Sequence, residues 1–166
     1  IYFMNNEHPI NLYNILLELS RNIFFYKTLQ LKDNFETRIY LMFMHFSIIL
    51  ILYRRKNVKF DQKDYDYLFN SIENNLRELG FGDVTVNKKM KELNKVLYDI
   101  LLKIELSSKK DSQFNLNHAL ISKYFNELND YKSPQYKAFE TYFSKFFNFC
   151  FELPLKNVLR DALKFI

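Results

Sequence analysis

The stretch Leu76-Arg77-Glu78-Leu79-Gly80-Phe81-Gly82-Asp83, continued by Val84-Thr85-Val86-Asn87-Lys88-Lys89-Met90-Lys91, decides how this chain folds. It holds both glycines of the 166-residue sequence. Apolar residues recur at three- and four-residue steps on either side of it, which indicates a helix before Gly80 and another after Asp83. Gly80 stands just past a helix end, where glycine adopts a positive φ most easily. The stretch predicts a tight helical hairpin turned by Gly80, Gly82 and Asp83.

Apolar periodicity and capping residues divide the rest of the chain into helices. His8-Pro9 opens a first helix, and a second, capped by Asp33 or Asn34, runs to about Tyr53 after a connector over residues 29–33. Asp61 caps the third, which ends at the hairpin. The inner face of the first helix is expected to be Leu12, Ile15, Leu16, Leu19, Ile23 and Tyr26.

Beyond the hairpin, residues 106–112 are rich in Ser and Lys and are the expected linker to the C-terminal helices. These helices are predicted over about 115–129, from Ser133-Pro134 onward, and from Pro154 to about Lys164. Alternating strand patterns, internal repeats and low-complexity tracts are absent from the sequence. The prediction is an all-α bundle of about seven helices in a single domain over 1–166, with the hairpin at its centre. With so few glycines, the other connections are expected to avoid left-handed backbone.

The most apolar segment, Ile39 to Tyr53, raises the question of a membrane span. Fifteen helical residues reach about 22 Å, which is short of a hydrocarbon core about 30 Å thick. We therefore expect a helix buried on nearly all sides at the centre of the bundle, with membrane insertion as the alternative. The sequence begins at Ile1 rather than Met, which indicates a fragment or a processed product.

The chain is mildly basic, with a formal net charge of +5 and a pI near 9.1. If the cations of the second and fourth helices converge, they form a patch suited to phosphates or acidic lipid headgroups. A solvated lysine-rich surface, and cations placed at a helix C-terminus by its dipole, are the alternatives. Carboxylates of the third helix are expected to pair with lysines of the fourth and help set their register. The basic candidates are Arg54, Arg55, Lys56, Lys59, Lys88, Lys89, Lys91 and Lys95.

No arrangement of residues in the sequence points to catalysis. His8, His45 and His118 lie far apart without metal-ligand spacing, and Gly80-Phe81-Gly82 follows a helix rather than the strand that phosphate-binding loops follow. We expect no metal, cofactor or active site, with His45 as a hydrogen-bonded core residue and Cys150 as a buried thiol. Aromatic residues after Pro134 occupy more than one helix face, and they are expected to fill the core or, alternatively, to form a partner-binding patch.

Two blocks of sequence resemble a known family. The first runs from Ser20-Arg21-Asn22-Ile23-Phe24-Phe25-Tyr26 to Arg38 and His45, and the second is the Leu76–Lys91 stretch followed by Tyr98. Their order and spacing are similar to the ubiquinol–cytochrome c chaperone family, whose members assist assembly of the respiratory ubiquinol–cytochrome c reductase. The resemblance covers about Leu12 to Leu102, with a weaker continuation at His118-Ala119-Leu120.

The resemblance implies an all-α, non-enzymatic assembly chaperone that binds newly made cytochrome b. It implies a small co-chaperone and ribosomal RNA as further partners, at the matrix side of the mitochondrial inner membrane or the cytoplasmic face of a bacterial one. The alternative is a basic helical protein that binds membrane or RNA peripherally without a specific client. A helical enzyme that depends on His45 or a buried carboxylate is a third hypothesis. The expected binding residues are Arg21, Tyr26, Arg38, Arg77, Lys88, Lys89 and Lys91.

Overall fold

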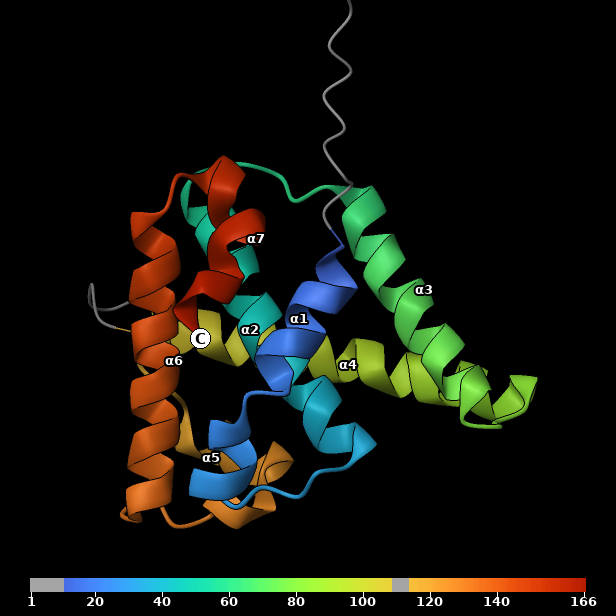
Figure 1. The fold of residues 1–166 in the computed structure, drawn as a ribbon, viewed down its shortest axis with the longest axis horizontal. Helices are drawn as coiled ribbons and strands as arrows, with labels where there is room; N and C mark the ends of the chain where they lie inside the picture. Colours follow the sequence, from blue (N-terminus) through green and yellow to red (C-terminus); the bar gives the residue numbers. More distant parts are fainter. Residues whose placement is uncertain (1–10, 109–113) are drawn as a thin grey trace, which may run out of the picture.

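The long helix α2 (Phe35–Arg55) lies at the centre of a helical fold, which a computed structural model describes for residues 11–108 and 114–166. The helices α1 (Leu12–Ser20), α4 (Asp83–Ser108) and α6 (Pro134–Glu152) all pack against α2. Figure 1 shows α6 at one side of the molecule and the joint between α3 and α4 projecting at the other. The described residues contain helices and no strand, which confirms the all-α prediction.

Burial rather than length makes α2 a core helix. Its 21 residues span about 31 Å, so the prediction that it is too short to cross a membrane was wrong. In the described residues it is the one helix that is long and apolar enough to span, yet 72% of its most apolar window is buried inside the structure. Asn34 caps its start by accepting a hydrogen bond from the Thr37 N–H at 2.9 Å.

The N-terminal helix is shorter than predicted. Asn11 caps α1, which ends at Ser20, and a single π-helical turn over Phe24–Thr28 follows. The break turns the chain, so Ile23 is 59% exposed and does not belong to the buried face. The predicted start at His8-Pro9 lies outside the described residues.

The hairpin turn forms as predicted after α3 (Gln62–Glu78). Gly80 has a φ of +95°, and its N–H donates to the carbonyl of Arg77 at 2.9 Å. The next N–H, that of Phe81, donates to the carbonyl of Leu76 at 3.4 Å. This pair of bonds is the Schellman motif, which satisfies carbonyls left free at a helix end. Gly82 does not have a positive φ, and it begins α4 by accepting the Val86 N–H at 2.9 Å.

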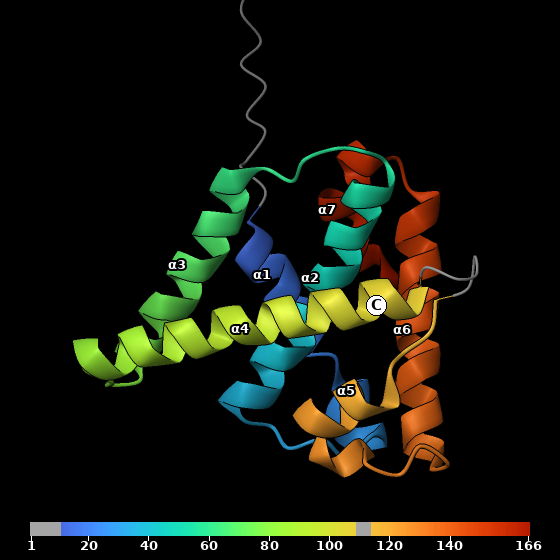
Figure 2. The ribbon, with the colours of Figure 1, turned by 180° about the vertical axis from the view of Figure 1, so that it is seen from behind.

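The two helices of the hairpin diverge from this turn instead of lying side by side. Figure 2 shows α4 running across the molecule toward α6 while α3 rises away from it. The α3 helix packs against α1, whereas α4 packs mainly against α2. The predicted pairing of α3 carboxylates with α4 lysines is wrong for the described residues. Arg77 of α3 instead pairs with Glu73 of its own helix and with Asp83 at the start of α4.

The C-terminal part is more broken than predicted. The α4 helix continues to Ser108, so residues 106–108 are helical, and the rest of the predicted linker, 109–112, lies outside the described residues. The predicted helix over 115–129 is α5 (His118–Tyr124) plus a 3-10 turn at Asn126–Leu128. Ser133 and Pro134 start α6 as expected, while the final helix is divided into Leu155–Asn157, α7 (Val158–Asp161) and Ala162–Phe165.

Aromatic rings fill the space between α2, α6 and the π-helical turn. Phe25 lies edge-on to Tyr142, with ring centroids 4.7 Å apart, and stacks on Phe143 at 6.0 Å. Phe165 from the last turn packs on Phe146 and also on Phe149, which is only half-buried. The interpretation of these aromatics as core is therefore confirmed for most of α6. Phe151, at 47% exposed, is an exception near the end of that helix.

Two connections use left-handed backbone without glycine, contrary to the prediction. Gln30, between the π-helical turn and α2, has a φ of 57°, and Asn57, after α2, has a φ of 55°. Asparagine tolerates this conformation better than most residues, because its short side chain bonds locally. At Gln30 the neighbouring N–H of Leu31 donates to the carbonyl of Phe25 at 3.0 Å, which helps fix the bend.

Serine at each glycine of the turn should have different effects. Gly80→Ser places a side chain at positive φ and should lower the free energy of unfolding by about 1–2 kcal/mol. Gly82→Ser is the matched control, since no atom lies within 4 Å of the new Cβ and serine is a favourable residue where a helix begins. Urea unfolding followed by circular dichroism measures both. Equal losses in the two variants would contradict a specific requirement for glycine at position 80.

Candidate functional site

The predicted binding residues of the first block come together beside the connector between α1 and α2. The Tyr26 hydroxyl donates to the Ser20 carbonyl at 2.7 Å, and Arg38 pairs with Asp33 at 3.1 Å. Burial, with the charge of Asp33 as a second cause, raises the pKa of Tyr26 to about 12. Tyr26 therefore ties the π-helical turn to the end of α1, and Arg38 ties the start of α2 to the connector before it. Arg21 is more exposed and makes only a long ion pair, 3.9 Å, with Glu18.

The second block forms the projecting end of the molecule, which we call the hairpin tip: Arg77, Leu79, Phe81, Val84, Lys88 and Lys89. Three of its side chains are apolar yet exposed, with Val84 at 85% as the extreme. Lys89 lies over the ring of Phe81 at 4.9 Å, a cation–π contact. Arg77 is held by Asp83 and Glu73. The tip thus presents apolar side chains bordered by cations.

The two basic groups do not converge into one patch. Arg54, at the end of α2, pairs with Glu105 near the end of α4, where their atoms are 2.6 Å apart. The nearest lysine of the other group, Lys95, lies 10 residues earlier on the same helix, about 15 Å away along its axis, and Lys91 lies about 21 Å away. Lys88 and Lys89 are farther still. The conditional prediction of a single basic surface is therefore not met, and the cations belong to two separate regions.

The basic residues at the end of α2 and just after it, Arg55, Lys56 and Lys59, form with Phe147 and Phe151 of α6 a region we call the cation–aromatic end. The guanidinium of Arg55 lies 5.0 Å from the ring centre of Phe147, and the Lys56 ammonium lies 6.0 Å from that of Phe151. Such contacts are favourable because the face of an aromatic ring carries partial negative charge. Together with exposed Lys59, these residues form a surface with both positive charge and apolar area.

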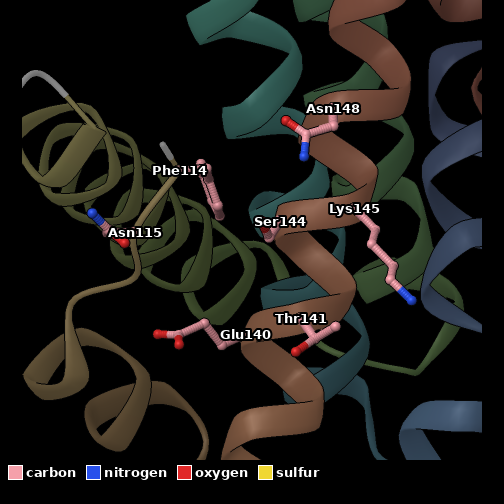
Figure 3. A pocket seen from close by; sticks show the side chains of 7 residues that line it. All are labelled: Phe114, Asn115, Glu140, Thr141, Ser144, Lys145 and Asn148. Carbon is pink, nitrogen blue, oxygen red and sulfur yellow. The ribbon is translucent and has the colours of Figure 1, made fainter. Parts of the chain in front are cut away.

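A wide open pocket of about 500 Å³ lies between the segment at Phe114 and α6. Figure 3 shows Phe114 and Asn115 on one side of it, with the Glu140 carboxylate directed toward that side and Lys145 directed away. Its lining is mostly amide, hydroxyl and charged groups, and Phe114 itself is buried by stacking on Phe147 at 5.2 Å. Nothing in the pocket joins a nucleophile to a base.

His45 is a structural residue, as predicted. Its ring is fully buried, and Nδ1 lies 2.6 Å from the Leu41 carbonyl oxygen, which can only accept a hydrogen bond. Nδ1 therefore carries the proton, and the neutral ring accepts the Tyr142 hydroxyl at Nε2, 2.8 Å away. Burial lowers the pKa of His45 to about 4. Cys150 is also buried, which raises the pKa of its thiol to about 12 and makes it unreactive.

The part of the chain that the structure describes contains no group of three or more His, Cys, Asp or Glu side chains that could hold a metal ion.

The prediction from sequence missed two sets of exposed apolar residues on the hairpin: Leu79, Phe81 and Val84 at the tip, and Tyr98, Leu102 and Leu106 on α4. Those on α4 fall outside the spacing of Val86, Leu93, Leu97 and Ile100, which face the core. That departure from periodicity is the pattern that reveals them.

The protein family described as ubiquinol-cytochrome C chaperone matches residues 27–165 of the chain. The matched range includes α5, α6 and the final turns, for which the resemblance seen in the sequence was weak. No curated protein and no solved structure matched the chain.

The buried imidazole should make stability depend on pH. His45 has a pKa of about 4 in the folded chain and near 6.5 in the unfolded one, so below pH 6.5 only the unfolded chain binds the proton. The free energy of unfolding should therefore fall as pH drops from about 6.5 toward 4, by about 3 kcal/mol in full. Urea midpoints over this range measure it.

The contribution of His45 is isolated by two variants. His45→Gln should be less stable at neutral pH, but its free energy of unfolding should fall much less between pH 6.5 and 4, because an amide does not titrate. His118→Gln, at an exposed histidine, should show the same fall in the free energy of unfolding as the unchanged chain. A decline of the same size in His45→Gln would contradict the assignment.

Proposed function

The chain belongs to the ubiquinol-cytochrome C chaperone family, and on this premise we propose that it binds newly made cytochrome b and protects it during assembly. Family membership implies a non-enzymatic role in building ubiquinol–cytochrome c reductase. Cytochrome b suits such a chaperone because its apolar membrane helices need cover until they are inserted and joined to partner subunits. The match over residues 27–165 is the observation that carries the proposal.

The hairpin tip is the surface that we assign to this client. Exposed apolar side chains that are not covered by the rest of a protein often mark a binding site. At the tip, Leu79, Phe81 and Val84 are exposed within six consecutive residues at the joint of α3 and α4. Figure 1 shows this joint projecting away from α2. They are suited to contact an apolar segment, while Lys88 and Lys89 are suited to acidic groups at its ends.

The other predicted binding residues divide into two kinds. Tyr26 holds the π-helical turn against the end of α1 and Arg38 holds the connector before α2, so their role in the proposal is to shape the surface rather than to touch the client. Arg21 and Lys91 are exposed and remain proposed contacts, as does Arg77 at the tip. A small co-chaperone and the ribosome are proposed as further partners, at the inner membrane of a mitochondrion or a bacterium.

A specific observation favours a second candidate function, peripheral attachment to a membrane or RNA. The cation–aromatic end carries Arg55 over Phe147, Lys56 over Phe151, and exposed Lys59. Positive charge attracts phosphate groups, and exposed rings insert at a lipid interface or stack on bases. This attachment would weaken steeply with salt, whereas capture of a client by apolar contacts would not.

Loss of the gene should selectively lower the amount of assembled cytochrome b. We expect membranes from cells that lack it to show a reduced b-type signal in the reduced-minus-oxidised haem spectrum, and a plasmid copy should restore the signal. The physical reason is that cytochrome b without its chaperone aggregates or is degraded before assembly. An unchanged signal, with the protein confirmed as expressed in the parent strain, would contradict the client assignment and leave peripheral attachment as the leading function.

A change at the tip should reproduce that loss without unfolding the protein. Val84→Asp removes the most exposed apolar side chain, and an acid in the first turn of α4 suits the helix dipole. A plasmid with this variant should restore less than half of the b-type signal. Tyr131→Asp, at a 55% exposed aromatic far from the tip in sequence, is the matched control and should restore it fully. Full rescue by both variants would remove the tip from the client site.

A further inference from the structure

The outward face of α4 carries an ordered stripe of exposed residues. They follow one another at steps of three and four and consist of cations and then apolar side chains: Lys88, Lys91, Lys95, Tyr98, Leu102 and Leu106. We call this set the outer stripe. The last three members are each more than half exposed, between 55% and 60%. The order divides the stripe into a basic half and an apolar half.

The stripe is narrow and lies opposite the core. At about 100° per residue its members fall within about a quarter of the helix circumference. The fully buried residues Val86, Leu97, Ile100 and Ile104 occupy the other side. From Lys88 to Leu106 the stripe is about 27 Å long, since each of 18 steps advances about 1.5 Å. This is the geometry of a helix seam that a second helix covers.

The three lysines are not neutralised by the chain itself. In residues 11–108 and 114–166, Lys88, Lys91 and Lys95 take part in no ion pair, whereas Lys103 on the flank pairs with Asp99 at 2.7 Å. An array of uncompensated cations at helical spacing favours a partner with carboxylates at the same spacing.

An apolar hollow lies beside the other half of the stripe. It has a volume of about 250 Å³ and is lined by Leu50, Tyr53, Val58, Phe60 and Tyr65 together with three polar residues. Tyr98 of the stripe is close enough to Tyr65 to contribute, after burial, to the raised pKa of that phenol. Arg54, which also lines the hollow, is anchored to Glu105 of α4. The hollow therefore adjoins the apolar half and offers room for a large apolar side chain of a partner.

We propose that the outer stripe docks an amphipathic helix of another protein, with acidic residues along one half of its contact face and apolar residues along the other. The acidic half pairs with Lys88, Lys91 and Lys95. The apolar half covers Tyr98, Leu102 and Leu106 and places one large side chain in the hollow beside Tyr65.

A helix fits this surface better than a membrane or a nucleic acid does. A bilayer takes up an apolar face along the whole length of a helix, whereas half of this stripe is lysine. RNA would contact the lysines but leave the apolar half exposed to water. Steps of three and four over several turns are the spacing at which side chains of one helix meet those of another.

The apolar half of the outer stripe lies away from the hairpin tip, so helix docking there is a binding event separate from client binding. Lys88 belongs to the hairpin tip and Lys91 borders it, but Leu102 and Leu106 lie five or more turns beyond Val84 along α4, about 27–33 Å away. The two proposals are therefore separable: Val84→Asp should impair the client role, while Leu102→Asp should impair helix docking.

The probe is a set of synthetic, fluorescently labelled 25-residue helical peptides, whose binding to the full chain is measured by anisotropy at low and high salt. Two of the peptides carry glutamates in one half of the contact face and leucines in the other. The glutamates are in the N-terminal half of one peptide and in the C-terminal half of the other, so that both a parallel and an antiparallel orientation on α4 are tested. In their counterparts lysine replaces glutamate. One glutamate peptide should bind at least tenfold more tightly than its lysine counterpart. The Leu102→Asp variant should bind that glutamate peptide at least tenfold more weakly than the unchanged chain does.

Charge reversal gives the decisive comparison. The triple variant Lys88→Glu/Lys91→Glu/Lys95→Glu should prefer the lysine peptide, whereas Lys137→Glu/Lys145→Glu/Lys156→Glu, with the same change of net charge, should keep the original preference. Circular dichroism confirms that each variant is folded. Absence of binding, or no exchange of preference on charge reversal, overturns the proposal. Binding of vesicles with 30 mol% anionic lipid that the Leu102→Asp variant abolishes, without peptide binding, would overturn it in favour of a lipid surface.

Discussion

Burial of α2 on nearly all sides is the constraint on which the rest of the structure depends. A helix this apolar is stable in water only when other helices cover it, and α1, α4 and α6 do so. The one ionisable side chain buried in this helix, His45, is accommodated because both ring nitrogens have partners, Leu41 on the same helix and Tyr142 on α6. That bond joins the N-terminal and C-terminal parts of the chain inside the core.

The surfaces available for binding follow from how little of α4 this core needs. The helix is about 39 Å long, and only its inner face is required to cover α2. Its N-terminal end projects with the turn at Gly80, and its outer face remains open to solvent. The tip and the outer stripe are therefore two consequences of one long helix, and both combine lysines with exposed apolar side chains.

The sequence predicted much of the fold because its main signs are local. The left-handed Gly80, the caps at Asn34, Asp61 and Ser133, and the apolar spacing of α2, α3 and α6 all depend on neighbouring residues. The prediction failed where contacts between residues far apart in the chain determine the structure. The break after Ser20 depends on Phe25 packing against α6, and the opening between α3 and α4 depends on α3 packing against α1 while α4 packs against α2.

The candidate surfaces were predictable only in part for the same reason. Local sequence shows that Lys88 and Arg54 are basic, but not that Arg54, on α2, lies beside Glu105 of α4, about 26 Å along that helix from Lys88, a separation that keeps these two cations in different regions. Exposure of Val84 or Leu102 is also not a local property, since an apolar residue is exposed only if no other element covers it. The family match adds the role in assembly that no arrangement of side chains states directly.

Whether newly made cytochrome b contacts the hairpin tip can be measured by site-specific photo-crosslinking during synthesis of membrane subunits. A photoreactive amino acid at Phe81, on the hairpin tip, should form a crosslink with pulse-labelled cytochrome b, and the same group at Tyr131 should not. The crosslink should survive high salt, because apolar contact rather than charge holds the client. If the probe at Phe81 gives no product with cytochrome b while the protein still supports assembly, the client does not bind at the tip, and that claim is wrong.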